Sequence, residues 1–302
     1  MQFESQTRRD LIGIGWMLTT GFCFVGVNTI VRGLEGAVPA AQAAFIRFLF
    51  GLMFLLPVAW PVLRRGFPIQ VWGLFALRGS LHIVAVVAWF YAMSRITIAE
   101  VTAIGFLNPI IVTVGAALFM GERLARRRIA AVCVALVGAL IVLRPGLRPL
   151  DPGHLSQVLA AVAFGASYLL AARLSGRAPA VVVVAMMSLV VSIGLAPLAW
   201  AQWVPPTAGQ VAALGLVAVF ATAGHYSMTR AFAAAPLTVT QPITFLQLIW
   251  ASLVGMFVFS EPVDGWVIIG GGLMIGAISY ITWREARQRA RTQTPAVNAA
   301  KL

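Results

Sequence analysis

Residues 89–122 read WFYAMSRITIAEVTAIGFLNPIIVTVGAALFMGE, and residues 228–261 read MTRAFAAAPLTVTQPITFLQLIWASLVGMFVFSE. The second stretch begins 139 positions after the first, and each passes through a long apolar run that ends on an acid. At this offset the matching positions are Ala92 and Ala231, Phe106-Leu107 and Phe245-Leu246, and Glu122 and Glu261. A fixed internal offset is the signature of a repeat. The chain is therefore expected to contain two copies of one unit.

The composition of the whole chain excludes a soluble protein. Of its 302 residues, 60% are hydrophobic and 10% are charged, whereas a soluble domain carries about a quarter of its residues as Asp, Glu, Lys and Arg. The net charge of +13 does not indicate nucleic acid, because the bases lie in short clusters between apolar runs. The lipid bilayer is therefore the expected partner of most of the surface.

Ten apolar runs are predicted to be helices that cross a bilayer. A hydrocarbon core about 30 Å thick needs about 20 apolar residues in a helix. The spans cover residues 11–31, 41–63, 71–93, 98–120, 128–143, 155–174, 179–201, 209–230, 237–259 and 265–283. These runs are too long for barrel strands and do not alternate apolar with polar residues. We expect an all-α polytopic membrane protein.

The ten spans divide into two repeats of five, and the odd number sets their relative orientation. Five crossings leave the chain on the opposite side of the membrane, so the second repeat must be inserted upside down. The fold class is thus ten transmembrane helices as two inverted five-helix repeats. The expected divisions are an N-terminal segment (1–10), a first repeat (11–146), a second repeat (147–284) and a polar tail that we expect to be disordered (285–302).

The basic residues predict which side of the membrane holds the termini. With the N-terminus inside, 16 of the 22 bases fall in cytoplasmic segments and four in outer loops. Cytoplasmic loops carry an excess of Lys and Arg. Both termini are therefore expected in the cytoplasm, with the protein in a bacterial inner membrane.

The sequence resembles the drug/metabolite transporter superfamily, specifically bacterial permeases with two tandem EamA domains. The stretches that carry the likeness are Trp89-Phe90-Tyr91-Ala92, Ile98-Ala99-Glu100, Asn108-Pro109, Gly121-Glu122 and Leu143-Arg144-Pro145-Gly146. It covers about residues 11–284 and is specific for the fold rather than the substrate. The second copy departs from the pattern, with Leu248 opposite Pro109 and Ser260 in place of the Gly before the acid. The resemblance implies movement of a solute by alternating access, without ATP hydrolysis.

Two charged residues inside the predicted spans form the first candidate site. Arg47 lies about two turns into the second span, and Glu100 is the only carboxylate within any span. Charges inside a membrane are costly and usually functional. We expect these two side chains to form an ion pair facing a central cavity. The alternative is a static pair that only positions the helices.

Three further ionisable residues are candidates for substrate binding or coupling. Arg78 and His82 are four residues apart in the third span, so they share a helix face. Arg suits capture of a carboxylate or phosphate, although Arg78 could instead extend to the cytoplasmic headgroups. His225, in the eighth span, could relay protons. The alternative, which we favour, is that His225 satisfies a neighbouring backbone or hydroxyl group.

Aromatic and amide side chains near the middle of spans complete the candidate list. Tyr168 and Trp250 could stack on a planar or cationic solute, whereas Trp89 and Tyr91 lie near a helix end, where an interfacial belt is the commoner explanation. The mid-span amides are Asn28, Asn108, Gln241 and Gln247. Asn108-Pro109 and Gln241-Pro242 would place an amide at a helix break that exposes backbone to a ligand, or would simply stabilise a kink.

The sequence does not indicate an enzyme, a metal site or a cofactor. The only Lys is Lys301, which excludes a P-loop, and the three histidines lie far apart without cysteine partners. No nucleophile elbow is present, and only one acid lies inside a span. Gly272 and Gly276 have the spacing of a close helix contact, which is compatible with a homodimer face.

The function expected from these features is secondary transport of a small organic metabolite. The bases and amides favour a substrate bearing carboxylates. The resemblance to a group rich in exporters favours export of an amino acid or an amino-acid-derived compound such as an opine-type metallophore. One alternative is uptake of a planar metabolite such as a nucleoside-like compound or vitamin. A more remote one is a membrane enzyme or assembly factor, for which the short loops leave little room.

Overall fold

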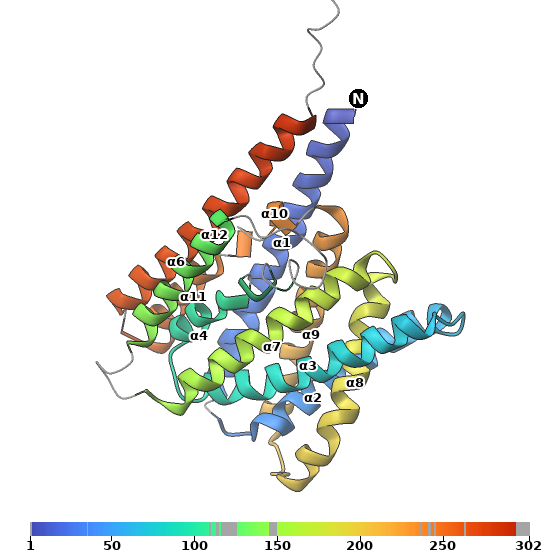
Figure 1. The fold of residues 1–302 in the computed structure, drawn as a ribbon. Coiled ribbons are helices and arrows are strands. Elements are labelled where there is room, and N and C mark those ends of the chain that lie inside the picture. Colours follow the sequence, from blue (N-terminus) through green and yellow to red (C-terminus); the bar gives the residue numbers. More distant parts are fainter. Residues whose placement is uncertain are drawn as a thin grey trace, which may run out of the picture.

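The computed structural model describes residues 2–34, 36–108, 110–112, 115, 126–144, 150–235, 237–240, 243–244, 246–262 and 264–293. Its helices are α1 (Gln2–Gly33), α2 (Ala40–Leu63), α3 (Ile69–Met93), α4 (Ile98–Gly105), α6 (Arg126–Leu143), α7 (Pro152–Ser175), α8 (Ala180–Ala201), α9 (Ala208–Ala234), α10 (Leu237–Thr240), α11 (Leu246–Phe259) and α12 (Gly265–Gln293). Figure 1 shows them as one helical bundle. The described part of the chain is helical apart from turns and short connections.

The described helices make the chain a multi-pass membrane protein. Six of them are long and apolar enough to cross a bilayer, namely residues 8–33 of α1 together with α2, α3, α7, α8 and α9. Shorter apolar helices cover Ile249–Phe259 and Gly265–Ala277. Many large apolar side chains on these helices are exposed, such as Met53, Trp200 and Phe257, as expected for a surface that faces lipid.

Local signals in the sequence explain where several helices begin. Pro39, Pro68 and Pro179 are the N-caps of α2, α3 and α8, and a proline can start a helix without losing a backbone hydrogen bond. Thr97 and Thr207 close capping boxes at the starts of α4 and α9. In such a box the threonine oxygen accepts a hydrogen bond from the third helical N–H.

The structure differs from the predicted spans in three places. The described α4 covers only the first eight residues of the fourth span. The ninth span is divided into α10 and α11, so the break expected near Pro242 lies between them, while Gln241 and Pro242 themselves lie outside the described residues, as do Pro109 and Glu122. At the C-terminus, α12 continues to Gln293, where a disordered tail was expected from residue 285.

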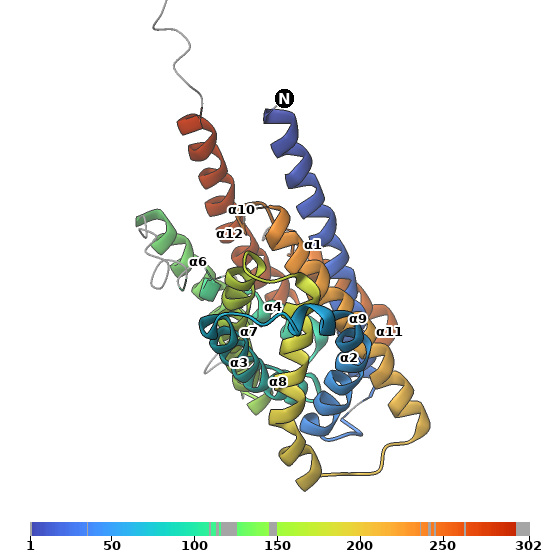
Figure 2. The same ribbon diagram turned by 90° about the vertical axis from the view of Figure 1, so that its right-hand side faces the viewer.

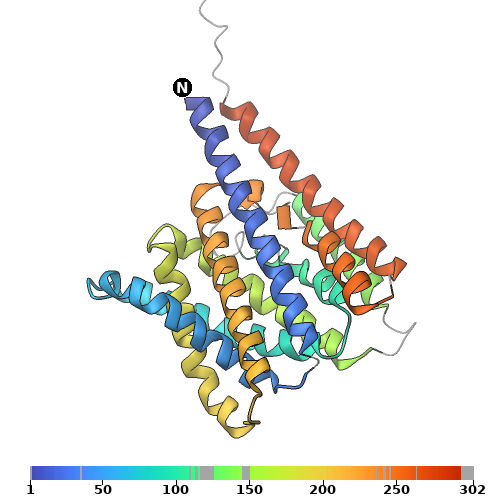
Figure 3. The same ribbon diagram turned by 180° about the vertical axis from the view of Figure 1, so that it is seen from behind.

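The helices pair across the two repeats with a two-fold pattern. In chain order the first repeat supplies α1, α2, α3, α4 and α6, and the second supplies α7, α8, α9, α10–α11 and α12. The pairs that pack together are α1 with α9, α3 with α7, α2 with α8, α4 with α11, and α6 with α12. If each helix is replaced by its counterpart in the other repeat, the pair α1–α9 becomes the pair α7–α3, and each of the other three pairs becomes itself again. The view from behind shows α1 and α9 side by side (Figure 3).

Contacts at the helix ends show that matching helices run in opposite directions. Gln42, at the start of α2, exchanges two hydrogen bonds with the backbone of Val204, just after α8, at 2.7 and 2.9 Å. Ile98, at the start of α4, donates its N–H to Glu261, just after α11, at 3.1 Å. Arg144, just after α6, pairs with Asp264, just before α12. Each matching pair is therefore antiparallel, as inverted repeats require.

The start of α1 and the end of α12 lie on the same side of the bundle (Figures 1 and 2).

The backbones of α6 and α12 meet at Gly138 and Gly270, where a Cβ added at Gly138 would lie 2.6 Å from the Gly270 carbonyl oxygen. Gly272 and Gly276 do not make such a contact, because a Cβ at either position would meet no described atom within 4 Å. The close approach within the chain thus involves Gly270, two residues before Gly272.

Candidate binding cavity between the repeats

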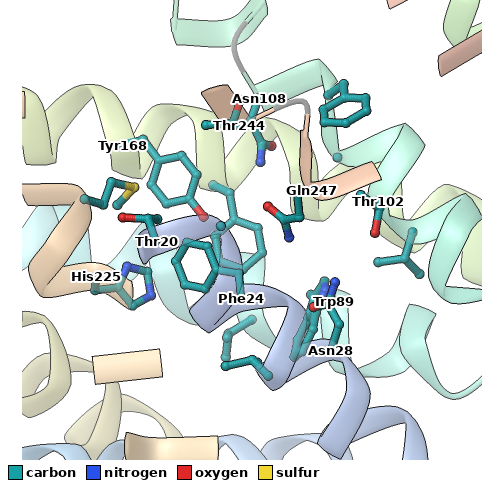
Figure 4. Close-up of a pocket in the computed structure, with 18 of the residues that line it drawn as sticks. Thr20, Phe24, Asn28, Trp89, Thr102, Asn108, Tyr168, His225, Thr244 and Gln247 are labelled. Carbon is teal, nitrogen blue, oxygen red and sulfur yellow. The ribbon is translucent and has the colours of Figure 1, made fainter. Parts of the chain in front are cut away.

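A cavity of about 140 Å³ lies between the two repeats, with walls from α1, α2, α3, α4, α7, α9 and α11 (Figure 4). A single water needs only about 10–15 Å³ of such space, so the cavity can hold a small organic molecule. Its polar lining residues are Thr20, Asn28, Arg47, His82, Thr102, Asn108, Gln157, Tyr168, His225, Thr244 and Gln247. The described lining contains no carboxylate.

Arg47 is the one positively charged residue in the described lining of the cavity. It lies in the second turn of α2, is 6% exposed, and its guanidinium carbon lies 4.0 Å from the centre of the Phe48 ring. Its Nε is buried without a hydrogen-bond partner among the described residues. A buried guanidinium without a carboxylate is costly in a membrane. Its placement in the cavity wall suits the capture of an anion.

Glu100 does not form the expected ion pair with Arg47, and that prediction was wrong. Its carboxylate accepts hydrogen bonds from the Thr97 backbone N–H and hydroxyl, both at 3.0 Å, and lies 3.3 Å from His154 Nε2. Glu100 is thus the third residue of the capping box that starts α4. The pattern Thr97-x-x-Glu100 is a capping-box signature that the sequence already contained.

His82 and His225 come from different repeats and meet at the cavity wall. Their ring centroids are 5.1 Å apart at 72°. His82 Nδ1 lies 3.1 Å from the Ser167 hydroxyl, but its Nε2 has no partner among the described residues, and neither has Nδ1 of His225. The favoured interpretation, that a neighbouring backbone or hydroxyl group satisfies His225, is therefore not met at Nδ1 in the described part of the chain. Figure 4 shows His225 beside Thr20 at the edge of the cavity.

Arg78 lies behind the cavity wall and does not extend to the headgroups. It is 1% exposed, and its NH1 donates to the Val183 carbonyl of α8 at 2.8 Å. Its Nε and NH2 have no partner among the described residues. It is not among the lining residues, although His82, four residues further along the same helix, is. Arg78 therefore joins α3 to α8 in this structure.

Among the described residues, three ion pairs and one histidine–carboxylate contact lie at the end of the bundle opposite the start of α1 and the end of α12 (Figure 1). They are Arg32 with Glu261 at 2.9 Å, Arg95 with Asp151 at 3.8 Å, Glu100 with His154 at 3.3 Å, and Arg144 with Asp264. In each pair one residue belongs to the first repeat and the other to the second. We call this set the ionic seal.

Arg32 and Glu261 make the most connected pair of the ionic seal. Arg32 also donates to the carbonyls of Met93 and Ile96, at 3.0 and 3.3 Å. Glu261 accepts the N–H of Ile98 at the start of α4, where the positive end of the helix dipole favours an acid. This pair therefore joins α1, the α3–α4 connection and the end of α11.

Comparison with known proteins decides what this architecture is. The model of the EamA-like transporter family matches the chain twice, over residues 11–144 and 151–283. The chain belongs to the EamA-like transporter family. It is therefore a transporter with tandem repeats rather than an enzyme, as the resemblance implied, and a small molecule and the membrane are its partners.

The relatives of this EamA-like transporter are named for several different substrates. A riboflavin transporter of Rhizobium johnstonii is 29% identical over 290 residues, which are 94% of this chain and 95% of the relative. An S-adenosylmethionine uptake transporter of Rickettsia bellii is 24% identical, over 93% of this chain and 96% of the relative. A pseudopaline exporter of Pseudomonas aeruginosa is 27% identical, over 89% of this chain and 95% of the relative. A crystal structure with 19% identity has the same fold, with a TM-score of 0.65 over 93% of this chain and 99% of the other.

The remaining candidates divide between the cavity of the transporter and its surface. Tyr168, Asn108 and Gln247 line the cavity, and Figure 4 shows the Tyr168 hydroxyl pointing into it. Trp250 is 42% exposed and packs on Phe22 instead, so its assignment to the cavity was wrong. Gln241 lies outside the described residues.

Sequence reasoning missed several cavity residues. Trp89, assigned to an interfacial belt, is 9% exposed and lines the cavity, whereas Tyr91 is exposed as a belt residue should be. Thr20, Phe24, Thr102 and Gln157 were not singled out. Their types are common in apolar helices, so only the packing of the helices distinguishes them from residues that face lipid.

Proposed function

We propose that this EamA-like transporter moves a small carboxylate-bearing metabolite across the bacterial inner membrane, with export as the net direction. The observation that carries the proposal is Arg47, a cation in the cavity wall whose Nε has no partner among the described residues. Arg binds carboxylates through two parallel hydrogen bonds. A lining with one cation and no described acid favours an anion over a cation.

Alternating access is the mechanism that best fits the arrangement of the repeats. The cavity lies between two inverted halves, which is where secondary transporters hold their substrates. If the termini are cytoplasmic, as the distribution of bases predicts, the ionic seal closes the outer end of the bundle. Transport would then require these pairs to separate so that the halves can open outward. Breaking them would expose the Arg47 side of the cavity to the outside.

Export of an amino-acid-derived acid is supported by the relative named as a pseudopaline exporter. The second candidate is uptake of a planar metabolite, and the aromatic lining of the cavity favours it. Phe24, Trp89, Phe106, Phe164 and Phe232 contribute rings to the wall. The relatives named for riboflavin and for S-adenosylmethionine uptake point in the same direction.

Comparative metabolite profiling tests the proposal. Cells lacking the gene would be compared with cells restored with wild type, Arg47→Ala or Arg64→Ala, the last being an exposed arginine just after the same helix. We expect a carboxylate-bearing compound to accumulate inside the deleted cells and disappear from the medium. Wild type and Arg64→Ala should restore its release, whereas Arg47→Ala should reduce it by at least about tenfold, as loss of a charged hydrogen bond predicts.

Other outcomes would contradict parts of the proposal. A compound that remains in the medium of the deleted cells would replace export by uptake. Full restoration by Arg47→Ala, with normal amounts of protein in the membrane, would remove the role of the arginine and with it the argument for an anionic substrate.

A further inference from the structure

His82 and His225 form a second polar site in the cavity beside Arg47. We propose that these two imidazoles bind a neutral hydrogen-bonding group of the substrate, so that the transporter selects a heteroaromatic acid over a carbocyclic acid of the same shape. The inference rests on the proposed function, because it takes Arg47 to bind the carboxylate. It assigns His82 and His225 a role in determining specificity, and it narrows the substrate class to heteroaromatic acids.

The histidines are buried polar groups with unused hydrogen-bonding capacity. His82 is 0% exposed and His225 is 3% exposed, and each has one ring nitrogen without a partner among the described residues. A neutral imidazole offers one N–H donor and one bare nitrogen acceptor. Buried polar atoms are nearly always paired in native proteins. Both rings lie in the cavity wall, but the unpaired nitrogens themselves are buried, so a ligand supplies the missing partner when the adjacent side chains move aside.

The rings around the pair hold it in place without satisfying it. Phe24 lies edge-on to His225 at 5.2 Å between centroids, and Phe48 and Phe164 lie edge-on to His82 at 5.6 and 5.1 Å. Phenylalanine has no hydrogen-bonding group. These contacts therefore fix the orientation of the imidazoles, and Tyr168, whose ring centroid lies 6.4 Å from that of His225, is a polar side chain beside the pair.

The same contacts place the histidines close to the positive charge. The Arg47 guanidinium lies over the Phe48 ring, and that ring packs edge-on against His82. One aromatic ring therefore separates the anion-binding group from the imidazole pair. A flat ring that carries a carboxylate on one side and a nitrogen on another can present one polar group to Arg47 and the other to the imidazoles. The cavity of about 140 Å³ is close in volume to one that binds benzene in another protein.

Binding of simple ring acids to the purified full-length protein in lipid nanodiscs tests the inference by calorimetry. The probes are benzoate and the three pyridine carboxylates, picolinate, nicotinate and isonicotinate, which share its shape and differ in the position of one ring nitrogen. Nicotinamide, which keeps the nitrogen but lacks the charge, is the fifth probe. We expect at least one pyridine carboxylate to bind about tenfold tighter than benzoate, the effect of one buried hydrogen bond.

Two variants assign that difference to the imidazoles. His225→Phe keeps a ring of similar size but removes both nitrogens, so benzoate should bind as it does to wild type while the preferred pyridine carboxylate falls to the benzoate level. Val219→Leu, on the same helix but 48% exposed and outside the cavity lining, should leave the ratio unchanged. Thermal unfolding of each variant shows whether it remains folded.

The outcomes separate this inference from the proposed function. Equal binding of benzoate and all three pyridine carboxylates to wild type overturns the histidine site and leaves anion binding intact. An unchanged ratio in folded His225→Phe also overturns it, as does failure of all four acids to bind at millimolar concentration. By contrast, nicotinamide binding as tightly as the acids, or acids binding equally to Arg47→Gln, contradicts the proposed anionic substrate.

Discussion

At the scale of single residues, Glu100 shows how a buried charge can be fully used by local structure. Its carboxylate accepts two hydrogen bonds from Thr97 and lies beside His154 of the other repeat. This leaves the acid at the start of α4, where the helix dipole also favours it. Arg47, by contrast, lies in the cavity wall with its guanidinium against the Phe48 ring and without a carboxylate partner among the described residues. The two charges thus have different surroundings, which fit a structural role for Glu100 and the ligand-binding role that we propose for Arg47.

Substitutions of Glu100 distinguish a structural acid from one that carries protons. Gln is also accepted at the third position of a capping box, so Glu100→Gln should transport at close to the wild-type rate. Glu100→Ala should lower the free energy of unfolding by about 1–2 kcal/mol, because the cap is lost. Transport in proteoliposomes and thermal unfolding measure the two effects. Loss of transport in a fully stable Glu100→Gln protein would show that the carboxylate itself is needed.

At the scale of helices, the pairing of α6 with α12 depends on one backbone contact. Gly138 and Gly270 let the two helices approach so closely that any side chain at Gly138 would meet a backbone oxygen. Backbone cannot move aside as a flexible side chain can. Small residues allow this type of packing between membrane helices, so the contact fixes how the fifth helices of the two repeats cross.

Substitution at these glycines should affect stability according to their surroundings. Gly138→Ala is expected to lower the free energy of unfolding by about 1–3 kcal/mol, the usual cost of overpacking. Gly272→Ala is the matched control on α12, because a Cβ there meets no described atom, and alanine should be neutral or slightly favourable in the helix. Denaturation of both proteins in the same detergent provides the comparison. Equal losses of stability would contradict the crossing described for α6 and α12.

The helices themselves could be predicted from the sequence more fully than the site. The length of apolar runs predicted where helices occur and how the chain divides into repeats, because crossing the bilayer requires a minimum length. Run length alone predicts continuous helices, since a broken helix has the same composition as a continuous one; Pro242 was the residue that indicated the break between α10 and α11. Run length did not separate Tyr168, in the cavity, from Trp250, on the surface, because lipid and cavity can both accommodate an aromatic ring.

At the scale of the whole molecule, the ionic seal joins the two repeats at one end of the bundle. The four pairs differ in how much each can contribute. Arg95 and Asp151 are exposed and 3.8 Å apart, and exposed pairs of this kind contribute little. The Glu261 side chain is 8% exposed and joins three segments through Arg32 and Ile98. Although the Arg32 side chain is 25% exposed, removing one partner of a pair with a buried carboxylate is costly, so we expect this pair to contribute more to the closed state than the exposed Arg95–Asp151 pair.

Loss of the Arg32–Glu261 pair is therefore expected to open the sealed end. Thr102 lines the cavity, so a cysteine there, in a chain with Cys23 and Cys133 replaced by serine, reports access from that end to a thiol reagent that cannot cross the membrane. Glu261→Gln should increase the labelling rate by about tenfold, equivalent to a shift of 1.4 kcal/mol between closed and open states. Asp151→Asn, which removes the exposed pair, should change it by less than about twofold. Equal labelling rates for Glu261→Gln and Asp151→Asn would show that the Arg32–Glu261 pair does not hold the two repeats together at this end.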